Sequence, residues 1–365
     1  MSSPINVCYQ SASSADWGGA SRVLFTNLKL IDRKAVNPIV LLPAEGPITA
    51  LLNNLEIDYF IWGQLTEFQN PFEFFSRFIQ AVRLFRKAEI QIFHINGANY
   101  WRPAEVLAAK VLGIPVVTHF HVNITSHGPW LKLSSAAAAV SEYTAKNSNP
   151  VGLPKVVIHN VVEIERFAHA KNIRAELGVS EDEVVFLFAG QIREIKGVDL
   201  FIKLAHELDD KRARFFIAGE CRNTEQINDA YTEKRLLSEF GQNNRIHYLG
   251  YRKDIGDIFH SADVIVVPSR WDEPFGLVNI EAGAAGKPVI ASAVGGIPEI
   301  IESGQNGFLF ERGNFSELLD CAKKLVVDSQ LRKEMGTRAL ETVKERFSSA
   351  PLRKLVDLYR GLASK

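Results

Sequence analysis

Two glutamates, Glu273 and Glu281, flank a stretch of seven residues that begins with a Pro-Phe-Gly turn. Such a turn is typical of a helix start, where backbone N–H groups lack an intrahelical partner and the helix dipole is positive. A phosphate binds well at such a place, and carboxylates accept hydrogen bonds from neighbouring hydroxyl groups. Two acids around an anion site therefore indicate a ligand with a phosphate between two sugars, as in a sugar nucleotide.

The segments on either side predict how these glutamates are held. The apolar run at 263–267 has the character of a buried strand and leads into Pro268-Ser269. A helix is expected over about 276–285, because Gly286-Lys287-Pro288 ends it with a glycine followed by a proline. Both acids then lie where a parallel strand ends, the edge at which open α/β sheets bind ligands.

A second loop carries two cations, Arg193 and Lys196, between a Val/Phe-rich strand that ends near Gly190 and a helix that begins after Gly197. Cations in a loop between a strand and a helix suit a diphosphate leaving group, because they neutralise charge that grows as the sugar–phosphate bond breaks. A surface Arg and Lys without a ligand is the alternative for this pair.

Two segments in the first half add further candidates. Gly18-Gly19 follows a strand and precedes a helix, which allows the backbone to approach a phosphate closely, although this is not the dinucleotide-binding fingerprint. His119 and His121 alternate along a strand and would share a face. No third ligand has a clear spacing to them, so no metal site is predicted.

The run from Tyr248-Leu249-Gly250 to Gly307-Phe308-Leu309 resembles the donor-binding region of retaining glycosyltransferases of family 4, which have the GT-B fold. Pro-Ser, the Glu-x7-Glu pair, Gly-Lys-Pro-Val and Gly-Gly-x-Pro-Glu all occur in the family's order. Weaker similarity extends to Gly18-Gly19-Ala20 and to the strand that ends at His121.

The resemblance implies a role for each candidate residue. Glu281 would bind the ribose, and Glu273 the hydroxyl groups of the donor sugar. Lys196 and Arg193 would hold the diphosphate, while His121 would face the transferred sugar. The remaining donor-binding candidates are Gly18, Gly19, Gly190 and Gln191 in glycine-containing loops, the backbone of Phe275, Gly276, Leu277 and Val278, and Tyr251 with Arg252 near the base.

One position departs from the family. Gln191 stands where the family has Arg directly after the first glycine, and Arg193 is assigned the missing charge as a hypothesis. The implied reaction is front-face transfer with retention from a UDP- or GDP-sugar to a glycan or lipid-linked acceptor, as in polysaccharide or lipopolysaccharide assembly. No metal or other cofactor is expected. A sugar-nucleotide epimerase of the same fold, or a non-catalytic sugar-nucleotide-binding protein, stays open as an alternative.

The alternation of apolar runs and helical patterns predicts an α/β protein, with two doubly wound Rossmann-like domains facing an interdomain cleft. The expected domains are 1–165, binding the acceptor, and 166–347, binding the donor; a helix over 348–365 packs on the second domain or crosses back to the first. Strands are expected at 5–9, 36–42, 57–61, 90–95, 114–120, 136–140, 155–158, 184–189, 213–218, 245–249, 263–267, 287–291 and 307–310, and helices include 20–31, 72–88, 103–112, 197–209, 226–241 and 315–346.

Composition restricts the partners. The 365 residues have a formal net charge of zero, so no overall field attracts nucleic acid. Three dispersed cysteines and the absence of a leader pattern favour a cytoplasmic protein. The basic segment 72–87 is amphipathic, and its phenylalanines predict a core helix with solvated cations; peripheral contact with the cytoplasmic face of a membrane is the alternative.

Overall fold

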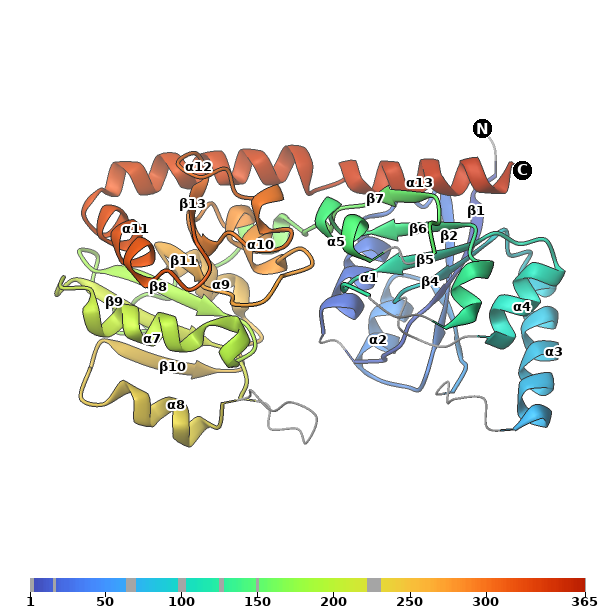
Figure 1. Ribbon diagram of the computed structural model, residues 1–365, viewed down its shortest axis with the longest axis horizontal. Coiled ribbons are helices and arrows are strands. Elements are labelled where there is room, and N and C mark those ends of the chain that lie inside the picture. The colour runs from blue at the N-terminus through green and yellow to red at the C-terminus, as the bar shows by residue number, and fades with distance from the viewer. Residues whose placement is uncertain are drawn as a thin grey trace. The chain divides into compact units, whose positions relative to one another are not determined.

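The computed structural model describes residues 3–15, 18–63, 70–97, 103–124, 128–148, 151–221 and 231–364. These residues contain two parallel β-sheets, of seven and six strands. The chain divides into two compact units, Met1–Val161 with Ser349–Lys365, and Val162–Ser348. Each unit holds one sheet with helices packed alongside it (Figure 1). The expected pair of Rossmann-like α/β domains is therefore confirmed.

The sheet of the first unit has the spatial order β3-β2-β1-β4-β5-β6-β7. Its strands are β1 Ile5–Gln10, β2 Val36–Leu42, β3 Asp58–Ile61, β4 Ile92–Ile95, β5 Val116–Phe120, β6 Ala136–Ala139 and β7 Lys155–Val157. Val7 and Tyr9 pack into one apolar core and Cys8 into another, because successive side chains of a strand point to opposite faces. Burial on both faces explains why inner strands such as β4, β5 and β6 are almost continuously apolar.

The last helix, α13 (Ala350–Ala363), belongs to the first unit although it ends the chain. Its apolar stripe of Leu352, Leu355 and Tyr359 is buried in the core that contains Val7 of β1 and Ile92 of β4. Packing on the second domain, one of the two placements expected from the sequence, is therefore wrong. The other helices of this unit are α1 Gly19–Leu30, α2 Pro47–Asn54, α3 Pro71–Lys87, α4 Pro103–Val111, η1 Pro129–Leu133 and α5 Glu142–Asn147.

The sheet of the second unit has the spatial order β10-β9-β8-β11-β12-β13. Its strands are β8 Val184–Ala189, β9 Ala213–Ala218, β10 Ile246–Gly250, β11 Val264–Val267, β12 Val289–Ser292 and β13 Gly307–Phe310. Its helices are α6 Glu165–Ala168, η2 Glu194–Lys196, α7 Val198–Glu207, α8 Glu233–Phe240, α9 Ile255–Ser261, α10 Leu277–Ala284, η3 Ile297–Glu299, α11 Phe315–Val327 and α12 Ser329–Arg346.

Two helix boundaries in the second unit differ from expectation. The single helix expected over 315–346 is broken at Asp328, whose carboxylate accepts a hydrogen bond from the Leu331 amide at 2.8 Å and so caps a new helix. The helix expected over 226–241 is present as α8, and residues 222–230 lie outside the described residues.

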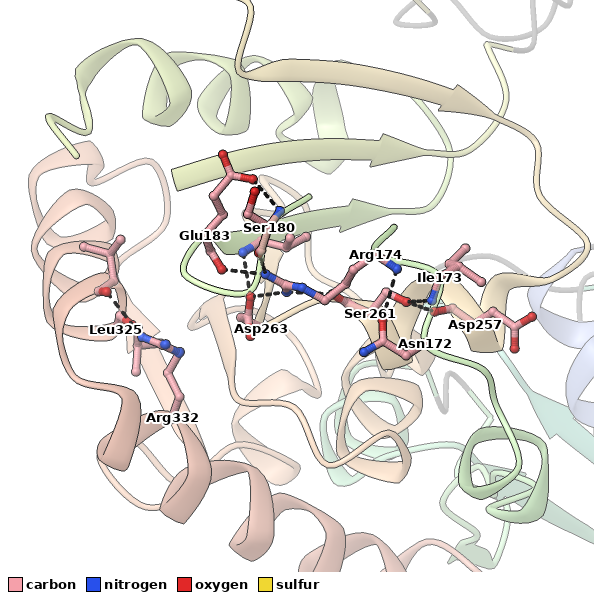
Figure 2. Close-up of polar contacts among 12 residues, drawn as sticks. Asn172, Ile173, Arg174, Ser180, Glu183, Asp257, Ser261, Asp263, Leu325 and Arg332 are labelled. Carbon is pink, nitrogen blue, oxygen red and sulfur yellow. Dashed lines mark hydrogen bonds and ion pairs between the residues drawn. The ribbon is translucent and has the colours of Figure 1, made fainter. Parts of the chain in front are cut away.

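The charged segment at the start of the second unit is anchored by Arg174 (Figure 2). The Arg174 guanidinium donates to Oδ2 of Asp263 at 2.8 Å and to the carbonyl oxygens of Ser180 and Glu183 at 2.8 and 2.6 Å. The Ile173 amide donates to Oγ of Ser261 at 2.8 Å. These bonds tie the loop before β8 to the residue that precedes β11, the strand that leads to the two glutamates.

Candidate functional site

The two loops with candidate residues in the second unit follow adjacent strands, β8 and β11. Chain order reverses between these strands, since β9 and β10 lie on one side and β12 and β13 on the other. Loops diverge at such a switch point and leave space for a ligand beyond the strand ends. The topology therefore brings together two segments about 80 residues apart at a ligand-binding edge.

The centre of this edge is an ion pair between Lys196 and Glu273. Nζ of Lys196 lies 2.6 Å from Oε1 of Glu273, and the Ser269 hydroxyl donates to the same oxygen at 2.9 Å. Glu273 is buried, so two donors on one oxygen compensate for the loss of hydration. Both contacts use Oε1, which leaves Oε2 able to accept hydrogen bonds from a ligand.

The backbone of Glu273 is held by the Gly-Gly pair that follows β12. The Gly296 amide donates to the Glu273 carbonyl oxygen at 2.8 Å. Gly295 has a φ of 56°, and a Cβ there would overlap the backbone of Glu273. Only glycine permits this approach without strain, so this part of the Gly-Gly-x-Pro-Glu sequence positions the first glutamate.

Aromatic and backbone contacts position Lys196. Its Nζ lies 4.9 Å from the centroid of the Trp271 ring, a distance typical of a cation–π contact. Gly197 has a φ of 76° and packs so tightly on Pro268 that a Cβ would overlap its carbonyl oxygen. The Arg270 amide donates to the Ile195 carbonyl oxygen at 2.8 Å, which fastens the loop after β8 to the loop after β11.

The N-terminus of α10 lies in the same loop as Glu273. Gly276 caps this helix with a φ of 97° and supplies no side-chain hydrogen bond to it. The amides of Leu277 and Val278 are thus directed at the edge of the sheet without a side-chain cap, an arrangement that favours anions. Glu281 is buried on the second turn of α10.

The other predicted residues of this unit lie in the loops that follow β8 and β10. Gln191 is exposed and Arg193 half-buried, in the loop after β8 on either side of the fully buried Ile192; Gly190 begins the loop. Tyr251 and Arg252 follow β10, which β9 and β8 separate from β11. Arg252 is paired with Asp254, with Nε 2.7 Å from Oδ1, so its guanidinium is already engaged.

In the first unit, Asn96 connects the predicted glycine loop to His121. Its side-chain oxygen lies 2.8 Å from Nε2 of His121, and its amide group donates to the Ala20 carbonyl oxygen at 3.0 Å. Gly18 has a φ of 95°, and a Cβ on Gly18 or Gly19 would meet no atom within 4 Å. The helix start after Gly18 is therefore open. These segments follow β1, β4 and β5; β1 and β4 flank the switch point of this sheet, and β5 adjoins β4.

Behind His121 lies a buried row of aromatic and imidazole rings. The His119 and His121 ring centroids are 4.2 Å apart, and those of His94 and His119 are 5.3 Å apart. Burial, reinforced by the neighbouring His121, lowers the pKa of His94 to about 3, and burial also lowers the pKa of His119 well below its usual value. His94 and His119 are therefore neutral.

Comparison with known proteins assigns the chain to a family. A model described as glycosyl transferases group 1 matches residues 169–342, and one described as Glycosyltransferase Family 4 matches residues 17–166. The chain belongs to the family 4 glycosyltransferases. The glycosyltransferase is 27 % identical over 303 residues to N-acetyl-alpha-D-glucosaminyl L-malate synthase of Bacillus anthracis. The alignment covers 76 % of this chain and 75 % of that enzyme.

Solved structures give the fold of this glycosyltransferase as GT-B. A glycosyltransferase from Rickettsia africae aligns with a TM-score of 0.83 at 20 % identity and covers 98 % of each chain. HepE of Anabaena in complex with UDP-glucose aligns with a TM-score of 0.77 at 21 % identity, covering 99 % of this chain and 100 % of the other. At these identities the likeness concerns the fold.

Sequence reasoning missed three residues that position candidate side chains of the glycosyltransferase: Ser269 and Trp271 in the second unit, and Asn96 in the first. The first two adjoin the glutamate motif, and Asn96 follows β4 at a strand end, so a search for polar or aromatic residues at every strand terminus would have found them. Among the described residues, no three His, Cys, Asp or Glu side chains are grouped to hold a metal ion. No described helix is long and apolar enough to cross a membrane.

Proposed function

We propose that this glycosyltransferase moves a sugar from a nucleotide-diphosphate sugar, with UDP or GDP as the nucleotide, to a glycan or lipid-linked acceptor, and that the anomeric configuration is retained. The observation that carries the donor assignment is the ion pair between the half-buried Lys196 and the buried Glu273, beside the uncapped start of α10. A cation and a helix N-terminus suit a diphosphate, while a carboxylate oxygen with spare capacity suits sugar hydroxyl groups.

Each residue has a distinct task in this proposal. Lys196 keeps two N–H donors beyond the one directed at Glu273, and these bind diphosphate oxygens together with the amides of Leu277 and Val278. Glu273 accepts hydroxyl groups of the donor sugar through Oε2, and Glu281 binds the ribose. Arg193 supplies the second cation in place of Gln191. The roles of Gly18, Gly19 and His121 stay predictions that rest on the family resemblance.

The proposed chemistry needs no nucleophile from the protein. The bond from the anomeric carbon to the diphosphate oxygen breaks as the acceptor oxygen bonds to the same face of that carbon, and the departing phosphate oxygen takes the acceptor proton. The charge that grows on the diphosphate is stabilised by Lys196, Arg193 and the helix start, groups already oriented before reaction. A metal ion is not required for this charge compensation.

Similar proteins support the donor class. HepE of Anabaena was solved with UDP-glucose bound, and the Bacillus anthracis relative is an N-acetyl-alpha-D-glucosaminyl L-malate synthase. The acceptor of the present enzyme is left at the level of a glycan or lipid-linked glycan, because acceptor contacts lie in loops that differ among enzymes of one fold.

A ligand screen followed by product analysis tests the proposal. Sugar nucleotides with different bases are screened for a rise in melting temperature, since a ligand that binds the native state stabilises it by mass action. The best donor is then incubated with acceptors in the presence of a chelator, and NMR gives the anomeric configuration of the product. Conversion of the donor sugar without an acceptor would indicate an epimerase, and binding without any transfer would indicate a sugar-nucleotide sensor.

A further inference from the structure

Helix α3 (Pro71–Lys87) has two apolar faces, of which only one is covered. Ala81 and Phe85 are buried in the core of the first unit, with Phe78 packed against it. Outside this core contact, Phe72 is 86 % exposed and Phe75 is 61 % exposed. The phenylalanines of this segment predicted a core helix; the structure corrects this for Phe72 and Phe75, because one side of a helix cannot hold so wide an apolar stripe.

The exposed aromatic residues form a continuous stripe with cations. Phe72, Phe75 and Ile79 follow the helical spacing of three and four residues, and Ile79 is 46 % exposed. The same spacing continues to Arg83 and Arg86, both exposed, and Lys87 lies beside them in the last turn. The face is thus apolar in its first half and positive in its second.

The cations of this stripe are available for an outside partner. Arg83, Arg86 and Lys87 make no ion pair with any residue that the structure describes, whereas the acid of this helix, Glu73, lies 3.8 Å from Arg77 on another side. The chain as a whole has no net charge, so this positive surface is a local feature of α3.

Apolar exposure continues on the neighbouring helix. Helix α4 (Pro103–Val111) packs along α3 (Figure 1) and exposes Val111 by 63 % and Leu107 by 38 %. Single exposed apolar residues are ordinary, but several on two adjacent helices mark an interaction site.

We propose that the outer face of α3, consisting of Phe72, Phe75, Ile79, Arg83, Arg86 and Lys87, docks on an anionic lipid bilayer. Phenylalanines enter the boundary between headgroups and acyl chains when an amphipathic helix lies flat on a membrane, and cations attract anionic headgroups. The residues of this face match both requirements. The proposal concerns the first unit alone and stands independently of the donor chemistry.

A second copy of the chain is a poorer occupant of this face. A two-fold contact centred on Ile79 would place Arg83 and Arg86 of each helix against the N-terminus of the other, which is the positive end of its dipole. The cations would then face positive charge, whereas anionic lipid compensates them.

Vesicle flotation tests the proposal with the full-length protein at low salt. The protein is mixed with vesicles of phosphatidylcholine alone or of phosphatidylcholine with phosphatidylglycerol. We expect binding to the anionic vesicles, weak or no binding to the neutral ones, and release by added salt, because surface attraction is screened within a Debye length. Failure to float with anionic vesicles, or equal binding to neutral ones, overturns the proposal.

Paired variants separate the apolar and the cationic contributions. Phe72→Ser with Phe75→Ser removes the two most exposed rings of the stripe, and Arg83→Gln with Arg86→Gln removes two charges. The charge variant should bind anionic vesicles roughly 25-fold more weakly, at roughly fivefold per cation near the surface. The aromatic variant should also lose most binding, while its melting temperature stays that of the wild type because the rings are exposed.

Matched controls lie in the second unit. Val327→Ser removes an apolar side chain that is 67 % exposed, and Lys323→Gln removes a cation whose side chain is 56 % exposed. Both should float as the wild type does. Equal loss in the controls and the α3 variants would contradict a specific face, and a dimer that Phe72→Ser dissociates in the absence of vesicle binding would identify a second copy as the occupant.

Discussion

The side chains of Lys196 and Glu273 meet at 2.6 Å although 77 residues separate them in the chain. Lys196 ends the short helix η2 after β8, and Glu273 precedes α10 after β11. In the absence of donor the two groups neutralise each other, so neither charge is buried unpaired. When a diphosphate binds Lys196, the Glu273 carboxylate and the diphosphate therefore share hydrogen bonds from the same amino group.

Loss of the Lys196 amino group should impair the reaction. We expect Lys196→Ala to lower kcat/KM for the donor by about 10²–10³, the usual effect of removing one group that stabilises developing charge. Steady-state kinetics measure this, with circular dichroism to confirm folding. Lys203→Ala on α7 is the control, because Lys203 also lies over an aromatic ring, 4.2 Å from the Phe315 centroid, and should behave as wild type. Similar losses in both variants would refute the assignment of Lys196.

Substitution of Gly295 should disturb Glu273 without touching its side chain. Gly295→Ala forces a Cβ into the Glu273 backbone, and we expect weaker donor binding as well as lower stability. Gly304→Ala is a matched control, since Gly304 also has a positive φ, 83°, but a Cβ there meets nothing within 4 Å. The control should cost about 1 kcal/mol of stability through backbone strain and leave the donor affinity unchanged. Calorimetric titration compares the two, and equal affinities would count against the Gly295 clamp.

The C-terminal helix is joined to the first unit by the Tyr359 hydroxyl. It donates to the Tyr9 hydroxyl at 3.1 Å, and its oxygen lies 2.8 Å from Nδ1 of His94. Tyr359→Phe leaves both partners buried without this contact, so the free energy of unfolding should fall by about 2 kcal/mol. Urea denaturation followed by tryptophan fluorescence reports on this unit, because four of the five tryptophans precede residue 162. Tyr251→Phe, at an exposed tyrosine, should change little, and an unchanged midpoint for Tyr359→Phe would show that the bond contributes nothing.

Acid should destabilise the first unit through its buried histidines. The folded pKa of His94 and His119 lies below the ordinary value near 6.5, so the unfolded chain binds more protons between those values. The stability that these histidines contribute is then fully present above about pH 6.5 and is lost as the pH is lowered, by about 2 kcal/mol for His94 between pH 7 and 5 and in the same direction for His119.

His119→Phe should reduce this acid sensitivity. Both ring nitrogens of His119 are buried without a hydrogen-bond partner among the described residues, so an apolar ring should fit with little loss at pH 7. Urea midpoints at pH 7 and pH 5 measure the difference. The exposed His206, replaced by Phe, serves for comparison and should keep the wild-type slope. A variant of His119 with the wild-type pH dependence would contradict this account.

Much of the fold could be predicted from the pattern of apolar and polar residues within short segments of the sequence. All thirteen expected strands are present within about three residues of their predicted bounds, because buried parallel strands are short apolar runs that alternate with helices. Family membership followed from residues that stand close together in the chain, such as those around Glu273. Predictions failed where one side chain decided the outcome, as at Asp328, whose cap divides a helix, and on α3, where burial of Phe85 leaves Phe75 outside.

The sequence by itself determined the strands and helices, the two domains and the candidate loops, since each depends on residues near one another in the chain. Only the tertiary structure decided that Lys196 pairs with Glu273, that Asn96 bridges Ala20 and His121, and that Tyr359 returns to the first unit to meet His94. These relationships join residues between 25 and 265 positions apart. The spacing of residues along the chain does not predict such contacts, because they arise from strand order and from the burial of apolar faces.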